Sequence, residues 1–232
     1  MYALSSSDGS LLWNFKTNDM IVSKPAYSEG KIFIGSWDGK LYVLDSSNGE
    51  LIWDFMTGGI VDSSPTVVED VVYVGSYDGS VYALDAFTGT VPIDTFSSEV
   101  LWKFRTNDMV MLSSPAVVDG VVYIGSYDYN VYALNSSNGF LIWNFTTDFA
   151  VVSSPAVFDG IVYVGSEDNN IYALNATNGK PVWVFETDDQ IHLSSPTVVN
   201  EAVFVGSSDS NVYALSSSDG SLLWNFKTND MI

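Results

Sequence analysis

The chain has 232 residues, enough for one large all-β domain or two small ones with a substantial buried core. Its 28 acidic and 8 basic residues give a net charge of −20, and such a surface repels nucleic-acid phosphates and anionic lipids, so neither is expected as a partner. The sequence has no cysteine, which excludes disulfides and thiolate metal sites, and its one histidine leaves little for acid–base chemistry. No apolar run approaches the roughly 20 residues of a transmembrane helix, so we expect no membrane insertion.

A Gly-Ser pair at the end of an apolar run recurs along the chain. Its glycines lie 40, 50, 40 and 41 residues apart, at Gly35, Gly75, Gly125, Gly165 and Gly206. Each unit contains four short runs of β-branched and aromatic residues separated by Gly, Asn, Asp and Ser, which predicts four strands. Four-stranded units of about 40 residues are typical of propeller blades. We therefore predict an all-β propeller of five four-stranded blades, with a parallel β-helix or a stacked sandwich as the alternatives.

Taken in chain order, residues 1–21 form a hairpin that is surplus to the five blades of residues 22–232. Ser23–Tyr27 is predicted as the innermost strand of the first blade and Leu222–Phe226 as the last outer strand. The second unit has about nine extra residues within 90–100. Pairs such as Asp38-Gly39 favour tight hairpin turns, because Asp, Asn and Gly tolerate positive φ. One tryptophan recurs in each outer strand, which predicts packing between neighbouring sheets, at Trp53, Trp102, Trp143, Trp183 and Trp224.

The repeat text V-Y-x-G-S-x-D-G-x-V-Y-A-L-D/N-x-x-x-G-x-x-x-W-x-F resembles the repeat of pyrroloquinoline-quinone-like β-propellers. That family includes quinoprotein alcohol dehydrogenases and a non-enzymatic scaffold lipoprotein of outer-membrane assembly. The resemblance covers essentially the whole chain and implies the fold, whereas the repeat text lies in the blades and specifies no cofactor. Family members usually close with seven or eight blades, and this sequence supplies five.

The two ends of the sequence are identical over 20 residues, because Tyr2–Ile21 repeats as Tyr213–Ile232 at an offset of 211. Three explanations stay open: a window of a long tandem array, overlapping ends made by engineering or permutation, and a recent duplication. We expect the array, since the chain begins in mid-blade. A hairpin with open edges favours association, and exchange of identical elements is an easy route to it. The predicted self-association residues are Tyr2, Leu4, Leu12, Trp13, Phe15, Tyr213, Leu215, Leu223, Trp224 and Phe226.

Aspartates of the turns after the second strand of each blade are predicted to gather on one face, at Asp38, Asp78, Asp128, Asp168 and Asp209. Rings of carboxylates can bind Ca²⁺ through oxygen ligands. However, each of these aspartates stands where a turn uses Asp or Asn for its own backbone hydrogen bonds. Turn structure therefore explains them without a metal, and we expect no cofactor, with Ca²⁺ as the alternative.

Other candidate chemistry is sparse. The resemblance implies, for a quinone enzyme, a vicinal cysteine pair, which a Cys-free chain cannot provide, and Trp37 lies at a turn outside any extra motif. His192 has no nucleophile motif near it, and we expect it at the surface or at a channel mouth. Three Asn-x-Ser/Thr patterns fit glycosylation acceptors, at Asn135, Asn144 and Asn175.

The sequence thus predicts a non-enzymatic structural or interaction propeller, a bead of a cell-surface or extracellular array or filament that associates with itself through the duplicated hairpin. A periplasmic address is also compatible with this composition. Other surface proteins or glycans are further partners to consider. The alternatives are a propeller that binds a cation, a glycan or a protein on its acidic face, and a quinoprotein dehydrogenase.

Overall fold

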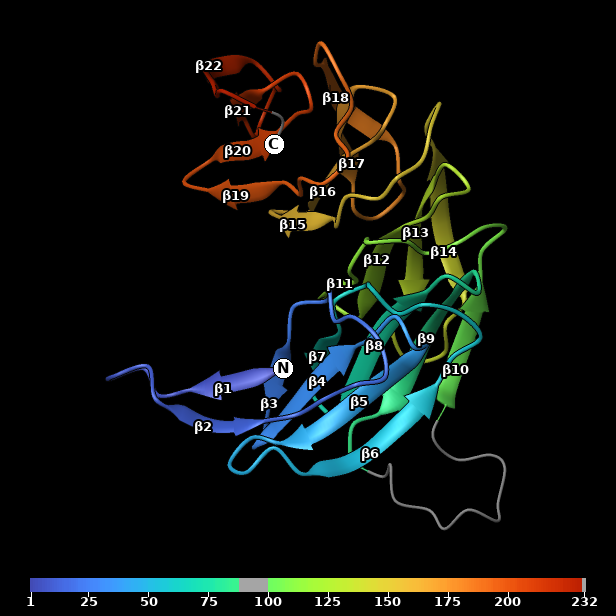
Figure 1. The fold of residues 1–232 in the computed structure, drawn as a ribbon. Helices are drawn as coiled ribbons and strands as arrows, with labels where there is room; N and C mark the ends of the chain where they lie inside the picture. Colours follow the sequence, from blue (N-terminus) through green and yellow to red (C-terminus); the bar gives the residue numbers. More distant parts are fainter. Residues whose placement is uncertain (88–99, 231–232) are drawn as a thin grey trace.

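A computed structural model describes residues 1–87 and 100–230, and it confirms the all-β fold with five four-stranded antiparallel sheets and an N-terminal hairpin (Figure 1). The predicted insertion at residues 90–100 lies almost entirely outside the described residues. Within the described ranges no helix is present, so none could cross a membrane.

The strands follow the repeat in sequence order, and within each sheet a strand is hydrogen-bonded to its neighbours along the chain. The hairpin consists of β1 (Tyr2–Leu4) and β2 (Leu11–Asn14). The first sheet contains β3 (Ala26–Ser28), β4 (Lys31–Gly35), β5 (Lys40–Asp45) and β6 (Leu51–Met56). The second contains β7 (Thr66–Val68), β8 (Val71–Ser76), β9 (Ser80–Asp85) and β10 (Val100–Arg105).

The remaining three sheets have the same order and nearly the same strand lengths. The third contains β11 (Ala116–Val118), β12 (Val121–Gly125), β13 (Asn130–Asn135) and β14 (Leu141–Thr146). The fourth contains β15 (Ala156–Phe158), β16 (Ile161–Gly165), β17 (Asn170–Asn175) and β18 (Pro181–Glu186). The fifth contains β19 (Thr197–Val199), β20 (Ala202–Gly206), β21 (Asn211–Ser216) and β22 (Leu222–Lys227).

The core of the molecule lies between successive sheets. The cluster between the third and fourth sheets, for example, joins Tyr123, Ala133 and Trp143 of one to Val164 and Leu174 of the next. Each internal contact between sheets has its own cluster of this kind. Because both faces of a blade are covered by its neighbours, the middle strands are apolar on both faces, which explains their continuous Val, Tyr and Ile runs.

The glycine of each of the first four Gly-Ser pairs is required by the contact with the following sheet. A Cβ at Gly125 would lie only 2.4 Å from the carbonyl oxygen of Val151, which begins the next blade. A Cβ at Gly35 would lie 2.5 Å from the carbonyl oxygen of Val61 in the same way. The repeat therefore keeps glycine where two backbones approach too closely for any side chain.

The N-terminal hairpin has a place in the fold, because it packs on the first sheet. Trp13 is buried, and it joins Ile34, Tyr42 and Leu44 of that sheet in a cluster with Phe15 at its margin. The hairpin thus takes the position of the two outer strands of a blade that would precede the first sheet. Apolar burial on one face accounts for this, since the hairpin has the same pattern as β21 and β22.

The sheets follow one another along a curve, and the hairpin and the last sheet lie at its two ends (Figure 1). The innermost strands contact in series, β3 with β7, β7 with β11, β11 with β15 and β15 with β19. In Figure 1 the last sheet, β19–β22, stands well apart from the hairpin β1–β2. The series of blades is therefore open, with two different ends.

Candidate functional site

The contact by which one blade holds the next is built from four repeated interactions, which we call the blade joint. The first is a tryptophan of the outer strand that lies on a glycine of the next sheet. The Trp143 indole N–H donates to the carbonyl oxygen of Ala176 at 2.8 Å. A Cβ at Gly179 would lie 2.6 Å from the Trp143 ring, so only glycine leaves room for the indole. Trp102 and Trp183 make the same pair of contacts with Gly139 and Gly220.

The second interaction of the blade joint is an aromatic pair. Phe145 of the outer strand meets the ring of Tyr172 in the next sheet, with ring centroids 5.2 Å apart and planes inclined by 60°. The equivalent pairs elsewhere in the series have separations of 5.3–5.5 Å, and they are Phe55–Tyr82, Phe104–Tyr132 and Phe185–Tyr213. Inclined rings at this distance interact favourably beyond the burial of their area.

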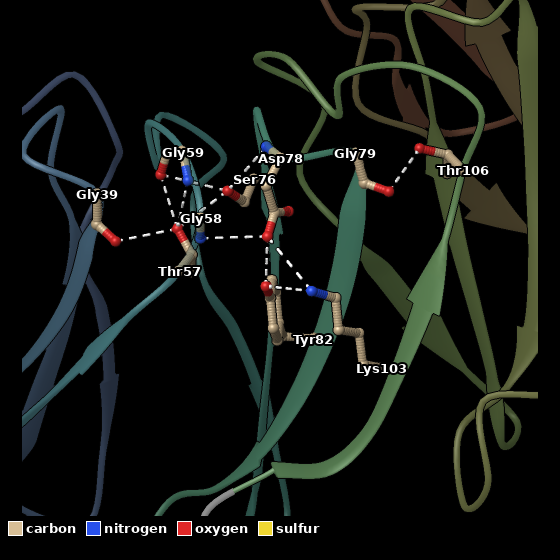
Figure 2. Close-up of polar contacts among 10 residues, drawn as sticks. All are labelled: Gly39, Thr57, Gly58, Gly59, Ser76, Asp78, Gly79, Tyr82, Lys103 and Thr106. Atoms are coloured by element: carbon tan, nitrogen blue, oxygen red, sulfur yellow. Dashed lines mark hydrogen bonds and ion pairs between the residues drawn. The ribbon is translucent and has the colours of Figure 1, made fainter.

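The third interaction is centred on the aspartate that follows each Gly-Ser pair. Figure 2 shows Asp78, whose Oδ2 accepts from the Gly58 N–H at 3.1 Å, from the Tyr82 hydroxyl at 2.5 Å and from the Lys103 ammonium at 3.4 Å. The Gly58 N–H belongs to the loop that leaves the previous sheet. The same loop and tyrosine donors reach the other four aspartates, at 2.8–3.2 Å and 2.6–2.7 Å, and these are Asp38, Asp128, Asp168 and Asp209.

Burial and hydrogen bonding shift the titration of these pairs. Burial alone would raise the pKa of Asp38, but hydrogen bonds from the Tyr42 hydroxyl and from two backbone N–H groups outweigh it and hold that pKa below its usual range. The pKa of Asp78 is lowered for similar reasons, with the Lys103 charge added. Burial and the neighbouring carboxylate raise the pKa of the partner tyrosines such as Tyr42. At neutral pH the pairs of Asp38 with Tyr42 and of Asp78 with Tyr82 are therefore each a carboxylate that accepts from a neutral phenol.

The fourth interaction lies where the innermost strands meet. The backbone N–H of the residue before each repeated proline donates to a serine hydroxyl of the following blade at 2.9 Å. The four bonds are Lys24 to Ser64, Ser64 to Ser114, Ser114 to Ser154 and Ser154 to Ser195. Lys24 stands where the other blades have serine, so the first blade offers no hydroxyl at this position. Among the described residues the Ser195 N–H has no acceptor.

The N-terminal hairpin makes three of the four interactions with the first sheet. The Trp13 indole N–H donates to the carbonyl oxygen of Ser46 at 3.0 Å, and its ring lies where a Cβ of Gly49 would be, at 2.5 Å. Phe15 pairs with Tyr42 at 5.4 Å. The Asn18 N–H donates to Asp38 at 3.0 Å. The hairpin is therefore held as the outer half of a blade would be.

The opposite end of the series has no such cover. Trp224 is 48% exposed, whereas Trp143 in the same position of the third blade is 8% exposed. Phe226 is 64% exposed, and every residue of β22 has an exposed side chain. The last blade thus presents the tryptophan and phenylalanine of a blade joint with no next sheet against them.

The predicted self-association residues fall into three groups. Tyr213 and Leu215 are buried in the cluster between the fourth and fifth sheets. Trp13 and Phe15 cover the first sheet, as described above. The others are exposed at the two ends, and they are Tyr2, Leu4, Leu12, Leu223, Trp224 and Phe226.

The aspartates considered for a metal are each engaged in a separate blade joint. No three Asp, Glu or His side chains come together as a metal-binding cluster within the described ranges. Asp62 was missed by the sequence reasoning, although it is buried and bridges two blades. Its carboxylate accepts from the Tyr77 hydroxyl at 2.6 Å and from the Leu112 N–H at 2.9 Å. The signal in the sequence is an acid at a position where the other four repeats have an apolar residue, Val22, Leu112, Val152 and Leu193.

The remaining predicted positions have structural partners. His192 lies at a cavity of about 430 Å³ where the innermost segments of all five blades meet, and its Nδ1 is 2.5 Å from the buried carboxylate of Glu167. Trp37 lies at a turn, and its backbone N–H donates to Met20. The side-chain oxygens of Asn135 and Asn175 accept from backbone N–H groups of their turns, and the Asn144 amide donates to Asn130.

Comparisons with known proteins agree with this repeat architecture. The family model described as outer membrane protein assembly factor BamB matches residues 1–150 and, in a second overlapping match, residues 92–231. A search of curated proteins finds no match.

Solved structures share the fold. BamB from Moraxella catarrhalis superimposes with a TM-score of 0.77 at 23% identity, over 94% of this chain and 65% of that one. The computationally designed Ika8 protein gives 0.82 at 18% identity, over 97% and 67%. The quinohemoprotein alcohol dehydrogenase ADHIIG from Pseudomonas putida HK5 gives 0.75 at 18% identity, over 94% and 44%. The chain thus spans about two thirds or less of the length of these proteins, and the likeness shows the fold alone.

Proposed function

Because the chain belongs to the family of β-propeller repeats described as outer membrane protein assembly factor BamB, we propose that it works as a non-enzymatic structural module that associates with copies of itself. The observation that supports self-association is the same 20-residue sequence at both ends, in two different environments. One copy covers the first sheet through Trp13, and the other leaves Trp224 exposed on the last sheet. The molecule therefore carries both halves of a blade joint.

The open ends of the series favour this role over that of an isolated domain. Repeat proteins bury their apolar faces against neighbouring repeats, and a terminal repeat without a polar outer face leaves such a surface in water. Phe226 and Trp224 form an exposed apolar surface of this kind on the last described blade. A second copy is a partner with a surface already shaped for them, because the first sheet accepts the identical residues Trp13 and Phe15.

We propose further that the module is a bead of a cell-surface or extracellular array. The strongly acidic, Cys-free surface supports this address, together with the Asn-x-Ser/Thr patterns at Asn135, Asn144 and Asn175. Intact mass spectrometry of protein from its native source would show added glycan mass at these sites. A mass equal to that of the polypeptide would contradict the glycan part of the proposal.

Sedimentation or light scattering of the full chain over a wide concentration range tests self-association. We expect a mass that rises with concentration above 25.3 kDa, the mass of one chain. The matched control is Trp224→Ala, which removes the exposed tryptophan of the last blade and should move the rise in mass to higher concentrations. A single-chain mass for the unaltered protein at every concentration would overturn the proposal.

An alternative function is the binding of a cation on the acidic face. The loops that leave the outer strands support it, since they carry further acids next to the aspartates of the joints, such as Asp108, Asp148 and Asp188. Isothermal titration with CaCl₂ distinguishes the two, because a saturable heat at about one ion per chain or more would favour a binding module. Added quinone with an alcohol substrate tests the dehydrogenase class, and turnover there would contradict a non-enzymatic role.

A further inference from the structure

We infer that the last blade of one copy, β19–β22, docks on the first sheet of a second copy, β3–β6, in the place that the hairpin β1–β2 occupies. The copies then join end to end, and the hairpin is an intramolecular cap that competes with the joint. This inference rests on the proposed self-association and deepens it by naming the two surfaces. It also assigns opposite roles to the two identical sequence segments.

The docked hairpin is a template for the contacts of the joint between copies. Its three anchoring residues are Trp13, Phe15 and Asn18, and their counterparts at an offset of 211 are Trp224, Phe226 and Asn229. The surface that receives them is made of Ser46 and Gly49 for the indole, Tyr42 for the phenylalanine ring and Asp38 for the backbone N–H. The incoming blade therefore finds an acceptor or a packing partner for each of these three groups.

A complete blade covers the first sheet better than the hairpin does. The hairpin brings two strands, and β1 pairs only with β2, so its other edge is open. A cavity of about 750 Å³ borders that edge, and it is lined by Phe15, Ile21, Pro25 and Ile34 among others. In the internal joints the two inner strands of the preceding blade pack here, as Ala116 and Tyr123 do against the fourth sheet. The last blade has these strands, β19 and β20, and the hairpin lacks them.

The hydrogen bonds from a backbone N–H to a serine hydroxyl where the innermost strands meet show how the joint between copies differs from the internal joints. The unpaired Ser195 N–H would face Lys24 of the second copy, which has no hydroxyl to accept it. The joint between copies therefore lacks one hydrogen bond that all four internal contacts have. This makes it the weakest contact of the series, and a reversible one. A serine at position 24 would supply the missing acceptor.

Two single variants distinguish the cap from the connector. Trp224→Ala removes the central anchor of the incoming blade, and we expect it to weaken association about 30-fold, the effect of a typical interface hot spot. Trp13→Ala loosens the cap within the same 20-residue sequence, and we expect it to strengthen association. Leu223→Ala is the matched control on β22. The sequence predicts Leu223 as a self-association residue, but its counterpart Leu12 is 64% exposed in the docked hairpin, and Leu223 itself lines a cavity with Tyr163 and Val182 of the fourth blade. This variant should leave the association constant unchanged.

Lys24→Ser adds a gain that a folding defect cannot imitate. We expect it to strengthen association about fivefold, which corresponds to one ordinary hydrogen bond. Cross-linking checks the geometry, because the natural chain has no cysteine. A mixture of Lys24→Cys and Ser195→Cys proteins should form a mixed disulfide dimer, since residues that share such an N–H to Oγ bond lie within disulfide reach.

The outcomes separate the two proposals. If Trp13→Ala weakens association, or if Trp224→Ala leaves it unchanged while the full chain still associates, the assignment of the joint is wrong and self-association stands. If no mixed disulfide forms between associated copies, the assignment is also wrong. If the full chain keeps a single-chain mass at every concentration, both proposals fail.

Discussion

The exposure of the repeated tryptophans predicts that one substitution has very different costs in two blades. We consider Trp143→Ala in the third blade and Trp224→Ala in the fifth, which alter the same position of the repeat. Trp143 is 8% exposed and its indole N–H donates to Ala176, whereas Trp224 is 48% exposed. The difference is 40% of a side chain that buries at most about 250 Å².

The magnitude follows from that difference in buried area. About 100 Å² of additional apolar burial at roughly 25 cal/mol/Å² corresponds to about 2.5 kcal/mol, and the lost hydrogen bond adds about 1 kcal/mol. We therefore expect Trp143→Ala to lower the free energy of unfolding by about 3–4 kcal/mol more than Trp224→Ala does. A difference of this size is comparable to the whole loss of about 3–5 kcal/mol that is usual when a buried tryptophan is replaced by alanine.

The assay is urea unfolding followed by far-UV circular dichroism, at a concentration where light scattering gives the mass of one chain. Working with single chains matters because association would stabilise the unaltered protein and Trp143→Ala, both of which retain Trp224. Equal losses of stability in the two variants would refute the reasoning, since they would mean that Trp224 is covered within its own chain.

Three further predictions follow from the blade joint. In urea unfolding, Gly179→Ala should lower the free energy of unfolding by about 1–3 kcal/mol more than Gly160→Ala does. Both glycines have φ near +70°, but only a Cβ at Gly179 would meet a tryptophan ring. Equal losses would show that backbone strain alone is responsible. Below about pH 4 the protein should lose stability, because the pKa values of Asp38, Asp78 and Asp209 are lowered in the folded protein. Such aspartates stabilise the fold above their unfolded pKa of about 3.9, and this contribution is lost as they are protonated. A melting temperature that is the same at pH 6 and pH 3 would contradict this. Above about pH 10 stability should fall again, because the raised native pKa of the paired tyrosines means that those of the unfolded chain ionise first. An absorbance at 295 nm that shows all 13 tyrosines ionised before the circular dichroism changes would contradict this.

The strands and their sheets could be predicted from the sequence because the signals are local. An alternating or continuous apolar run indicates a strand, and Asp-Gly or Asn-Gly between two runs indicates a hairpin. Gly39, for example, has φ of +86°, as its turn requires. The recurrence of one tryptophan per outer strand also predicted packing between sheets, which Trp102, Trp143 and Trp183 confirm.

The arrangement of the blades could not be predicted in the same way. The curve of the series depends on the angle between successive sheets, which side chains at each interface set and which no period in the sequence reports. The hairpin was therefore treated as surplus, and the structure places it on the first sheet. Asp62 was missed for a related reason, since its partners Tyr77 and Leu112 are 15 and 50 residues away in the chain.

The departures from the repeat carry information that the repeat itself does not. Lys24 takes the place of the serine that, in the other four blades, accepts a hydrogen bond from the backbone N–H of the preceding blade. No described blade precedes the first one to donate such a bond. The Trp53 indole N–H has no acceptor in the part of the chain that the structure describes, and the sheet against which Trp53 packs is the one that carries the insertion. The exception at Trp53 thus distinguishes one internal joint from the other three, and the exception at Lys24 marks the sheet on which we propose that a second copy docks.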